Sequence, residues 1–259
     1  MGRFNMRDRA RTSARFWARL WTALLLAWAV SAAPALARPI PIKVVVLTTF
    51  EVGEDTGDRP GEFQHWVESY PLERRMSVPG VERPVRLSGD GVLGVVTGMR
   101  ARPRETIAAL ISGGRFDLSH AYWIVAGIAG VDPRAGSIGS AAWARWVVDA
   151  DPLFELDDRD APAGWPWGLY SLGTQVPSKK GSAAGSSGMA WKLDPGLVSW
   201  AYGLTRDIAL PDSDALRAAR AGFPSEPAAL APPRVFVGDA LGTVRFWHGT
   251  RRTEWARDW

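Results

Sequence analysis

The chain has 259 residues, of which 46% are apolar and 22% charged, and its formal net charge is +4. This composition excludes a disordered chain, a collagen-like repeat and a coiled coil, and the length suffices for one large domain or two small ones. Cysteine is absent, which excludes disulfides, thiolate metal sites and cysteine nucleophiles.

The first 37 residues have the pattern of a secretory signal peptide. Six arginines precede residue 20, an apolar run follows at Leu20–Val30, and small residues end at Ala35-Leu36-Ala37. The alternative is an uncleaved membrane anchor, but the apolar run is about half as long as the ~20 residues that a spanning helix needs. We therefore expect a cleaved leader and a periplasmic or secreted protein.

The leader also carries the excess of basic charge. Its six arginines and one aspartate give +5, which leaves −1 of the total of +4 for residues 38–259. Nucleic-acid binding requires a basic surface, so nucleic acid is not an expected partner. The remaining sequence has no second long apolar run, which excludes a polytopic membrane carrier.

Apolar periodicity and turn residues predict alternating strands and helices in residues 38–259. In chain order these are a strand at 42–47, a weak helix at 61–69, strands at 83–87 and 94–97 joined by an Asp-Gly turn, a helix at 104–112, a buried strand at 122–126, a strand at 143–149, a helix at 197–204, a short helix near 214–221 and a strand at 234–237. This order predicts an α/β fold with a mostly parallel or mixed central sheet flanked by helices, in a single domain. The Gly/Ser/Ala-rich stretch at about 177–188 is expected to be a flexible insertion.

Four of the predicted strands end in small, polar or glycine residues. These ends are Thr48-Thr49, Thr97-Gly98, Gly127–Gly130 and Gly238-Asp239. In an open α/β sheet the ligand crevice lies outside the carboxyl ends of the strands, and glycine lets backbone N–H groups approach a ligand. Each loop taken alone is more typical of a tight turn, but because four of them converge on one edge, we expect a small-molecule pocket there.

A metal centre is not expected. The three histidines, His65, His120 and His248, are far apart in the sequence and lack the spacing of known metal motifs. We expect neither a metal nor a cofactor.

Five segments together resemble the purine nucleoside permease family. They are IKVVVLTTFEVGEDTGDRPGEFQHW (Ile42–Trp66), GVVTGMRARP (Gly94–Pro103), AYWIVAGIAGVDPRAGSIGSAAWARWVVD (Ala121–Asp149), KLDPGLVSWAYGLT (Lys192–Thr205) and PRVFVGDALGTVRFWHG (Pro233–Gly249). The resemblance implies a nucleoside phosphorylase-like α/β fold and a role in nucleoside uptake. It also implies a purine nucleoside as ligand.

The resemblance also implies which residues meet the nucleoside. These are Thr49, Phe50, Thr97, Gly98, Met99, Gly127, Ile128, Ala129, Gly130, Asp239, Trp247 and His248. Trp247 could stack on a purine and Asp239 could orient His248; the alternative is a buried aromatic patch at 246–248.

Departures from the phosphorylase pattern limit the chemistry. Val125 and Ile128 stand where phosphorylases usually have a phosphate-binding Arg and a Ser or Thr, so phosphorolysis is disfavoured. Hydrolases with this fold use a carboxylate after the first strand to activate water, and Glu51 matches that position most closely, with Glu54 next. The alternative for Glu51 is an acceptor of backbone N–H groups that holds its own loop.

Three functions therefore remain open. The first is an exported nucleoside-binding protein that assists uptake with an unidentified membrane partner, and the second is a nucleoside hydrolase-like enzyme. The third is an inactive family member. The resemblance implies one more strand after Trp259, with a Met-Glu-Asp-Thr-Gly segment, so the chain looks truncated. Base release from inosine or adenosine separates the first two.

Overall fold

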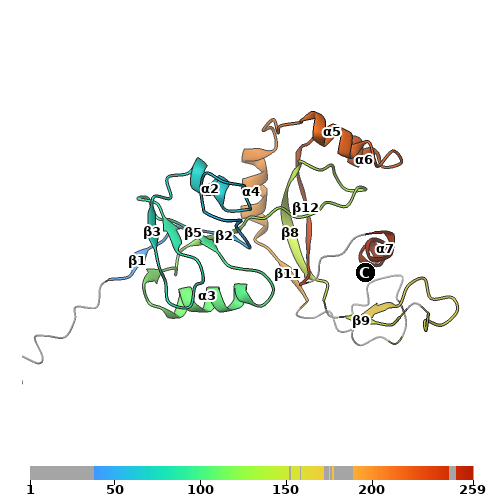
Figure 1. The fold of residues 1–259 in the computed structure, drawn as a ribbon, viewed down its shortest axis with the longest axis horizontal. Helices are drawn as coiled ribbons and strands as arrows, with labels where there is room; N and C mark the ends of the chain where they lie inside the picture. Colours follow the sequence, from blue (N-terminus) through green and yellow to red (C-terminus); the bar gives the residue numbers. More distant parts are fainter. Residues whose placement is uncertain are drawn as a thin grey trace, which may run out of the picture. The chain divides into compact units, whose positions relative to one another are not determined.

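The computed structural model describes residues 38–151, 153–157, 159–171, 175, 177, 189–244 and 249–258. The predicted leader and nearly all of the predicted insertion lie outside this part. The chain forms two compact units, which are described separately (Figure 1). Of the described residues, the first unit contains residues 38–98 and Arg102–Val125, and the second contains Met99–Ala101 and those from Ala126 onward.

The first unit is built on a five-stranded sheet in the order β3-β4-β5-β2-β7. The strands are β2 (Val44–Thr48), β3 (Arg74–Met76), β4 (Val85–Leu87), β5 (Val92–Val96) and β7 (Tyr122–Val125). The β-branched β2 lies at the parallel centre, hydrogen-bonded to β5 on one side and β7 on the other. β3 and β4 extend the sheet in antiparallel pairings, and a short parallel pair, β1 (Ile40–Pro41) and β6 (Phe116–Asp117), lies apart from it.

Two helices cover opposite faces of this sheet. Alternate residues of a strand point to opposite faces, and Leu93 and Val95 share one core with Leu110 of α3 (Arg102–Ser112). Val96 instead shares a core with Phe63, just before α2 (Gln64–Ser69). Figure 1 shows α2 and α3 on either side of the strands.

Close packing explains a glycine in the middle of β5. A Cβ atom at Gly94 would lie 2.7 Å from Cε2 of Phe63 and 3.0 Å from Cδ1 of Leu72. Both of these side chains are fully buried. Gly94 therefore lets the chain around α2 approach the sheet.

The second unit has a three-stranded sheet in the order β11-β8-β12. β8 (Ala141–Asp149) pairs parallel with β12 (Val235–Gly242) and antiparallel with β11 (Ala190–Lys192). A separate hairpin joins β9 (Leu153–Glu155) to β10 (Leu169–Ser171). The helices of this unit are α4 (Pro195–Thr205), α5 (Asp214–Arg220), α6 (Pro227–Leu230) and α7 (Thr250–Asp258).

Side chains fix two of these helices. The indole Nε1 of Trp143 in β8 donates to the hydroxyl of Thr205 at 2.9 Å, which holds the end of α4. In α7, Trp255 packs into a small core with Trp167 and Leu169. Asp194 caps the N-terminus of α4 by accepting the N–H of Leu197 at 2.7 Å.

The α/β class predicted from the sequence is confirmed, and two predictions about strands are wrong. The strand at 122–126 was expected to be buried, but Tyr122 is 61% and Val125 75% exposed, because β7 is the edge strand of its sheet. The last strand was expected to end at Gly238-Asp239, but β12 continues to Gly242 because β8 offers partners that far. Its register shifts between Gly238 and Ala240, so Asp239 lies in a bulge.

Among the described residues, no helix combines the length and the apolarity needed to cross a bilayer.

Candidate functional site

The carboxyl edge of the first unit's parallel strands is a topological switch point. β2 comes first along the chain, and the later strands β5 and β7 lie on opposite sides of it in the sheet. The connections consequently leave on opposite faces, and the edge where this happens is the usual ligand site in open α/β sheets. Thr48, Val96 and Val125 end the three strands at this edge.

The threonines at this edge hold the strand ends together. The Thr97 N–H and hydroxyl both donate to the carbonyl oxygen of Thr48, at 2.8 and 3.0 Å. The Thr106 hydroxyl of α3 donates to the Thr97 carbonyl at 3.0 Å. Thr97 is buried, and its hydroxyl proton is donated to the Thr48 carbonyl. Its side chain is therefore a structural part of this edge and has no proton left to donate to a ligand.

Thr49 is held by a neighbouring carboxylate. Its N–H and hydroxyl donate to the same oxygen of Glu62, at 2.6 and 2.8 Å, and the Glu62 N–H donates to the Phe50 carbonyl at 3.3 Å. Glu62 was missed by the analysis of the sequence. Its position two residues before α2 was the available signal, because carboxylates gather at helix N-termini.

Glu51 accepts hydrogen bonds from four backbone N–H groups. One carboxylate oxygen accepts from Val52 at 2.8 Å and from Gly61, and the other accepts from Phe63 at 2.7 Å and Gln64 at 2.5 Å. Burial opposes ionisation of this carboxyl group, but the four bonds outweigh burial and lower its pKa. These contacts match the second interpretation of Glu51, the loop anchor; its role as a base stays a prediction.

A buried ion-pair cluster fixes the rest of the loop at 49–63. Asp55 is 2% exposed and pairs with Arg83 at 3.1 Å and Arg86 at 2.9 Å. Arg83 also donates to the Gly53 carbonyl at 2.6 Å. The loop is thus tied both to α2 and to the arginines before and within β4, so the predicted residues Thr49, Phe50 and Glu51 are held by a rigid frame.

The segment after Thr97 has an unusual backbone. Gly98 has φ +79°, and Arg100 is the one described non-glycine residue with positive φ, at 66°. Such conformations cost free energy for a residue with a Cβ atom. Gly98 belongs to the first unit, whereas Met99, which is exposed, belongs to the second.

The remaining predicted residues belong to the second unit or are not described. Gly127, Ile128, Ala129 and Gly130 are exposed and form no helix or strand. Asp239 is half-exposed, and its carboxylate lies 3.7 Å from the guanidinium of Arg145. Trp247 and His248 lie outside the described residues. The structure therefore brings together Thr49, Phe50, Glu51, Thr97 and Gly98.

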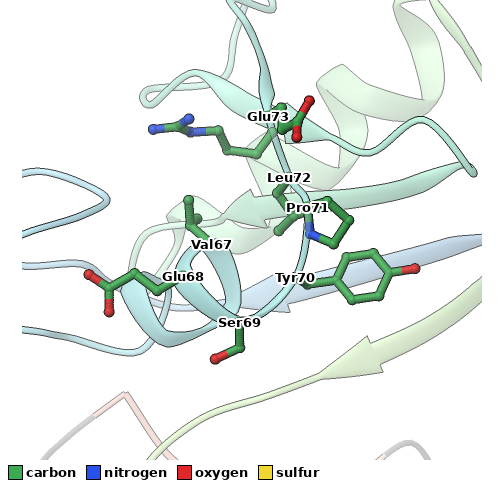
Figure 2. A pocket seen from close by; sticks show the side chains of 8 residues that line it. Val67, Glu68, Ser69, Tyr70, Pro71, Leu72 and Glu73 are labelled. Carbon is green, nitrogen blue, oxygen red and sulfur yellow. The ribbon is translucent and has the colours of Figure 1, made fainter.

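Two cavities of the first unit lie away from this edge. The cavity in Figure 2, of about 400 Å³, is lined by Val67, Glu68, Ser69, Tyr70, Pro71, Leu72, Glu73 and Arg86. The Tyr70 hydroxyl donates at 2.6 Å to Asp90, in the turn that precedes β5, so this cavity lies toward the amino ends of the strands. Glu68 and Glu73 point in different directions (Figure 2), so they do not form an acid–base pair.

A second cavity, of about 680 Å³, is lined mainly by apolar side chains of α3, β6 and β7. Neither cavity contains a predicted site residue. Within the part of the chain that the structure describes, no three His, Asp or Glu side chains are grouped to hold a metal ion.

Comparison with known proteins identifies the family. The family described as purine nucleoside permease matches residues 41–259. A curated relative from Schizosaccharomyces pombe, named "Probable purine nucleoside permease", is 27% identical over 159 residues, which cover 58% of this chain and 45% of the relative. The match thus spans less than half of that relative. No solved structure matches the chain, so the nucleoside phosphorylase-like fold stays a prediction. The chain belongs to the purine nucleoside permease family.

Proposed function

We propose that this chain is an exported nucleoside-binding protein that assists the uptake of purine nucleosides. The observation that carries the proposal is the switch point at the ends of β5, β2 and β7, in a chain whose family is named for purine nucleoside transport. Export rests on the leader pattern of residues 1–37. Delivery of the ligand to a membrane partner is part of the same proposal.

The first unit offers suitable groups for a sugar. Thr49 follows the end of β2, and its hydroxyl oxygen, which donates its proton to Glu62, keeps its lone pairs as acceptors. A ribose hydroxyl could donate to that oxygen. The adjacent Phe50, which is partly exposed, offers an apolar surface for the ring atoms.

Binding fits these groups better than hydrolysis does. A general base must be free to accept a proton, but both oxygens of Glu51 already accept two N–H groups each. Its lowered pKa also makes it a weaker proton acceptor. A rigid, ionised anchor suits a preformed binding site.

The proposal is tested by titrating the chain with inosine and with adenosine in a calorimeter, while chromatography monitors free base. We expect saturable binding without base release. Thr49→Val should weaken binding about tenfold, because a lost hydrogen bond costs about 1 kcal/mol or slightly more. Thr56→Val, at an exposed position in the same loop, is the matched control and should bind normally.

Two outcomes would contradict the proposal. Absence of saturable binding to either nucleoside rules out a nucleoside-binding function. Release of free base at a rate proportional to protein concentration, and lost in Glu51→Gln, assigns the chain to the hydrolase class instead.

A further inference from the structure

The second cavity is an apolar groove on the first unit. Its apolar lining comes from the start of the described chain, from the last turns of α3 and from β6 and β7: Pro39, Ile107, Ile111, Phe116, Leu118 and Trp123. Asp117 and Ser119 complete it, and their side chains are hydrogen-bonded to each other at 2.6 Å. The groove therefore offers apolar contact with few free polar groups.

Large apolar side chains in this groove are open to water. Ile111 is 62% and Trp123 is 36% exposed, although both belong to regular elements packed on the core. Burying apolar surface releases about 25 cal/mol per Å², so an apolar segment of suitable length would bind here. The groove is distinct from the switch-point edge, and this inference does not rest on nucleoside binding; it shares with the proposed function only the leader pattern of residues 1–37.

The chain itself supplies such a segment next to the groove. Thirty-seven residues precede Arg38, and Pro39 lines the groove. The apolar run Leu20–Val30 (LWTALLLAWAV) ends eight residues before Arg38. At about 3.3 Å per extended residue, that connection reaches over 25 Å, which is enough for the run to fold back onto α3.

We propose that, in the uncleaved chain, the apolar run Leu20–Val30 occupies the groove formed by α3, β6 and β7. The tether keeps the run at an effective concentration of the order of millimolar, so even weak apolar contact holds it there. A leader held in this way is hidden from any export machinery that must bind it. Folding of the first unit before export is thus a competing step that delays processing of the leader.

The absence of cysteine makes this contact directly testable by disulfide formation. The uncleaved chain, made without membranes, would carry Leu25→Cys together with Ile111→Cys. The matched control carries Leu25→Cys together with Glu105→Cys, at an exposed position of the same helix that does not line the groove. Under mild oxidation we expect the disulfide to form within one chain, at least about fivefold faster in the Ile111 pair, because docking raises the local concentration.

A second variant tests the apolar nature of the contact. The pair Leu25→Cys and Ser119→Cys reports on the same groove, and adding Ile111→Glu should slow its disulfide about tenfold, because a carboxylate is costly to bury against an apolar run. Circular dichroism verifies that each variant is folded.

Equal rates in the Ile111 and Glu105 pairs would overturn the proposal. So would an Ile111→Glu change that leaves the Ser119 rate unaltered. A disulfide that links two chains, with a rate that rises with protein concentration, would instead assign the groove to a second copy.

Discussion

Replacing the carboxylate of Glu51 tests whether this residue anchors the loop at 49–63. Each oxygen of Glu51 accepts two backbone N–H groups, from Val52 and Gly61 on one side and from Phe63 and Gln64 on the other. In Glu51→Gln one oxygen remains, and the new NH₂ group faces a pair of N–H donors. Two of the four hydrogen bonds are therefore lost.

The magnitude follows from the two lost bonds. Hydrogen bonds to charged groups contribute about 1.5–3 kcal/mol each, and solvent screening at this half-buried position favours the low end. We expect the free energy of unfolding to fall by about 2–3 kcal/mol at pH 7. The exposed Glu54 in the same loop is the matched control, and Glu54→Gln should change stability by less than about 0.5 kcal/mol.

The effect should depend on pH in a defined direction. The folded-state pKa of Glu51 lies below its ordinary value of 4.5, so its contribution is complete above the unfolded pKa and is lost as pH falls through the folded pKa. The difference in unfolding free energy between wild type and Glu51→Gln should therefore shrink below pH 4.5.

Urea denaturation between pH 3 and 7 measures this difference, and hydrogen exchange measures it locally. The amides of Gly61, Phe63 and Gln64 should exchange faster in Glu51→Gln, while those of β2 keep their protection. Unchanged stability and unchanged exchange at these amides would refute the role of Glu51 as a loop anchor. Loss of base release with intact stability would assign it to catalysis.

Three further substitutions test the packing and the ion pairs. Gly61→Ala should destabilise the loop by about 1–3 kcal/mol, since the new Cβ would lie 2.8 Å from the Glu51 carboxylate. Thermal unfolding measures this loss of stability, and titration with a nucleoside should show a lower affinity. Gly94→Ala should cost about 1–3 kcal/mol through overpacking against Phe63, measured by urea denaturation. Arg257→Ala removes a two-pronged pair with Asp132 in the second unit and should cost about 1–2 kcal/mol.

Each of these has a result that contradicts it. A stable Gly61→Ala or Gly94→Ala variant would mean that the neighbouring side chain moves aside at no cost. For the ion pair, the Arg257 guanidinium lowers the Asp132 pKa despite partial burial, so the cost of Arg257→Ala should disappear as pH falls through the folded pKa of Asp132. A cost that is independent of pH would assign the effect to packing of α7.

Local sequence determined the individual elements of this protein. The β-branched run at 42–47 became β2, the Asp-Gly turn joined β4 to β5, and Pro103 with the glycines at 113–114 bounded α3. These signals act over a few residues, through steric preference and turn conformation. The predicted ends of the strands at 42–47 and 94–97 each lie one residue from the observed ends of β2 and β5, so the carboxyl edge was located from the sequence.

Only the tertiary structure decided which groups meet at that edge. The order β5-β2-β7 leaves β7 exposed at the edge of the sheet, and pairing with β8 extends β12 beyond Asp239. The carboxylates of Glu51 and Glu62 accept hydrogen bonds from N–H groups that lie more than ten residues away in the sequence. Strand order and loop closure bring these distant residues together. Local sequence could mark Glu51 and Glu62 as candidate acceptors, but it could not specify which N–H groups they accept.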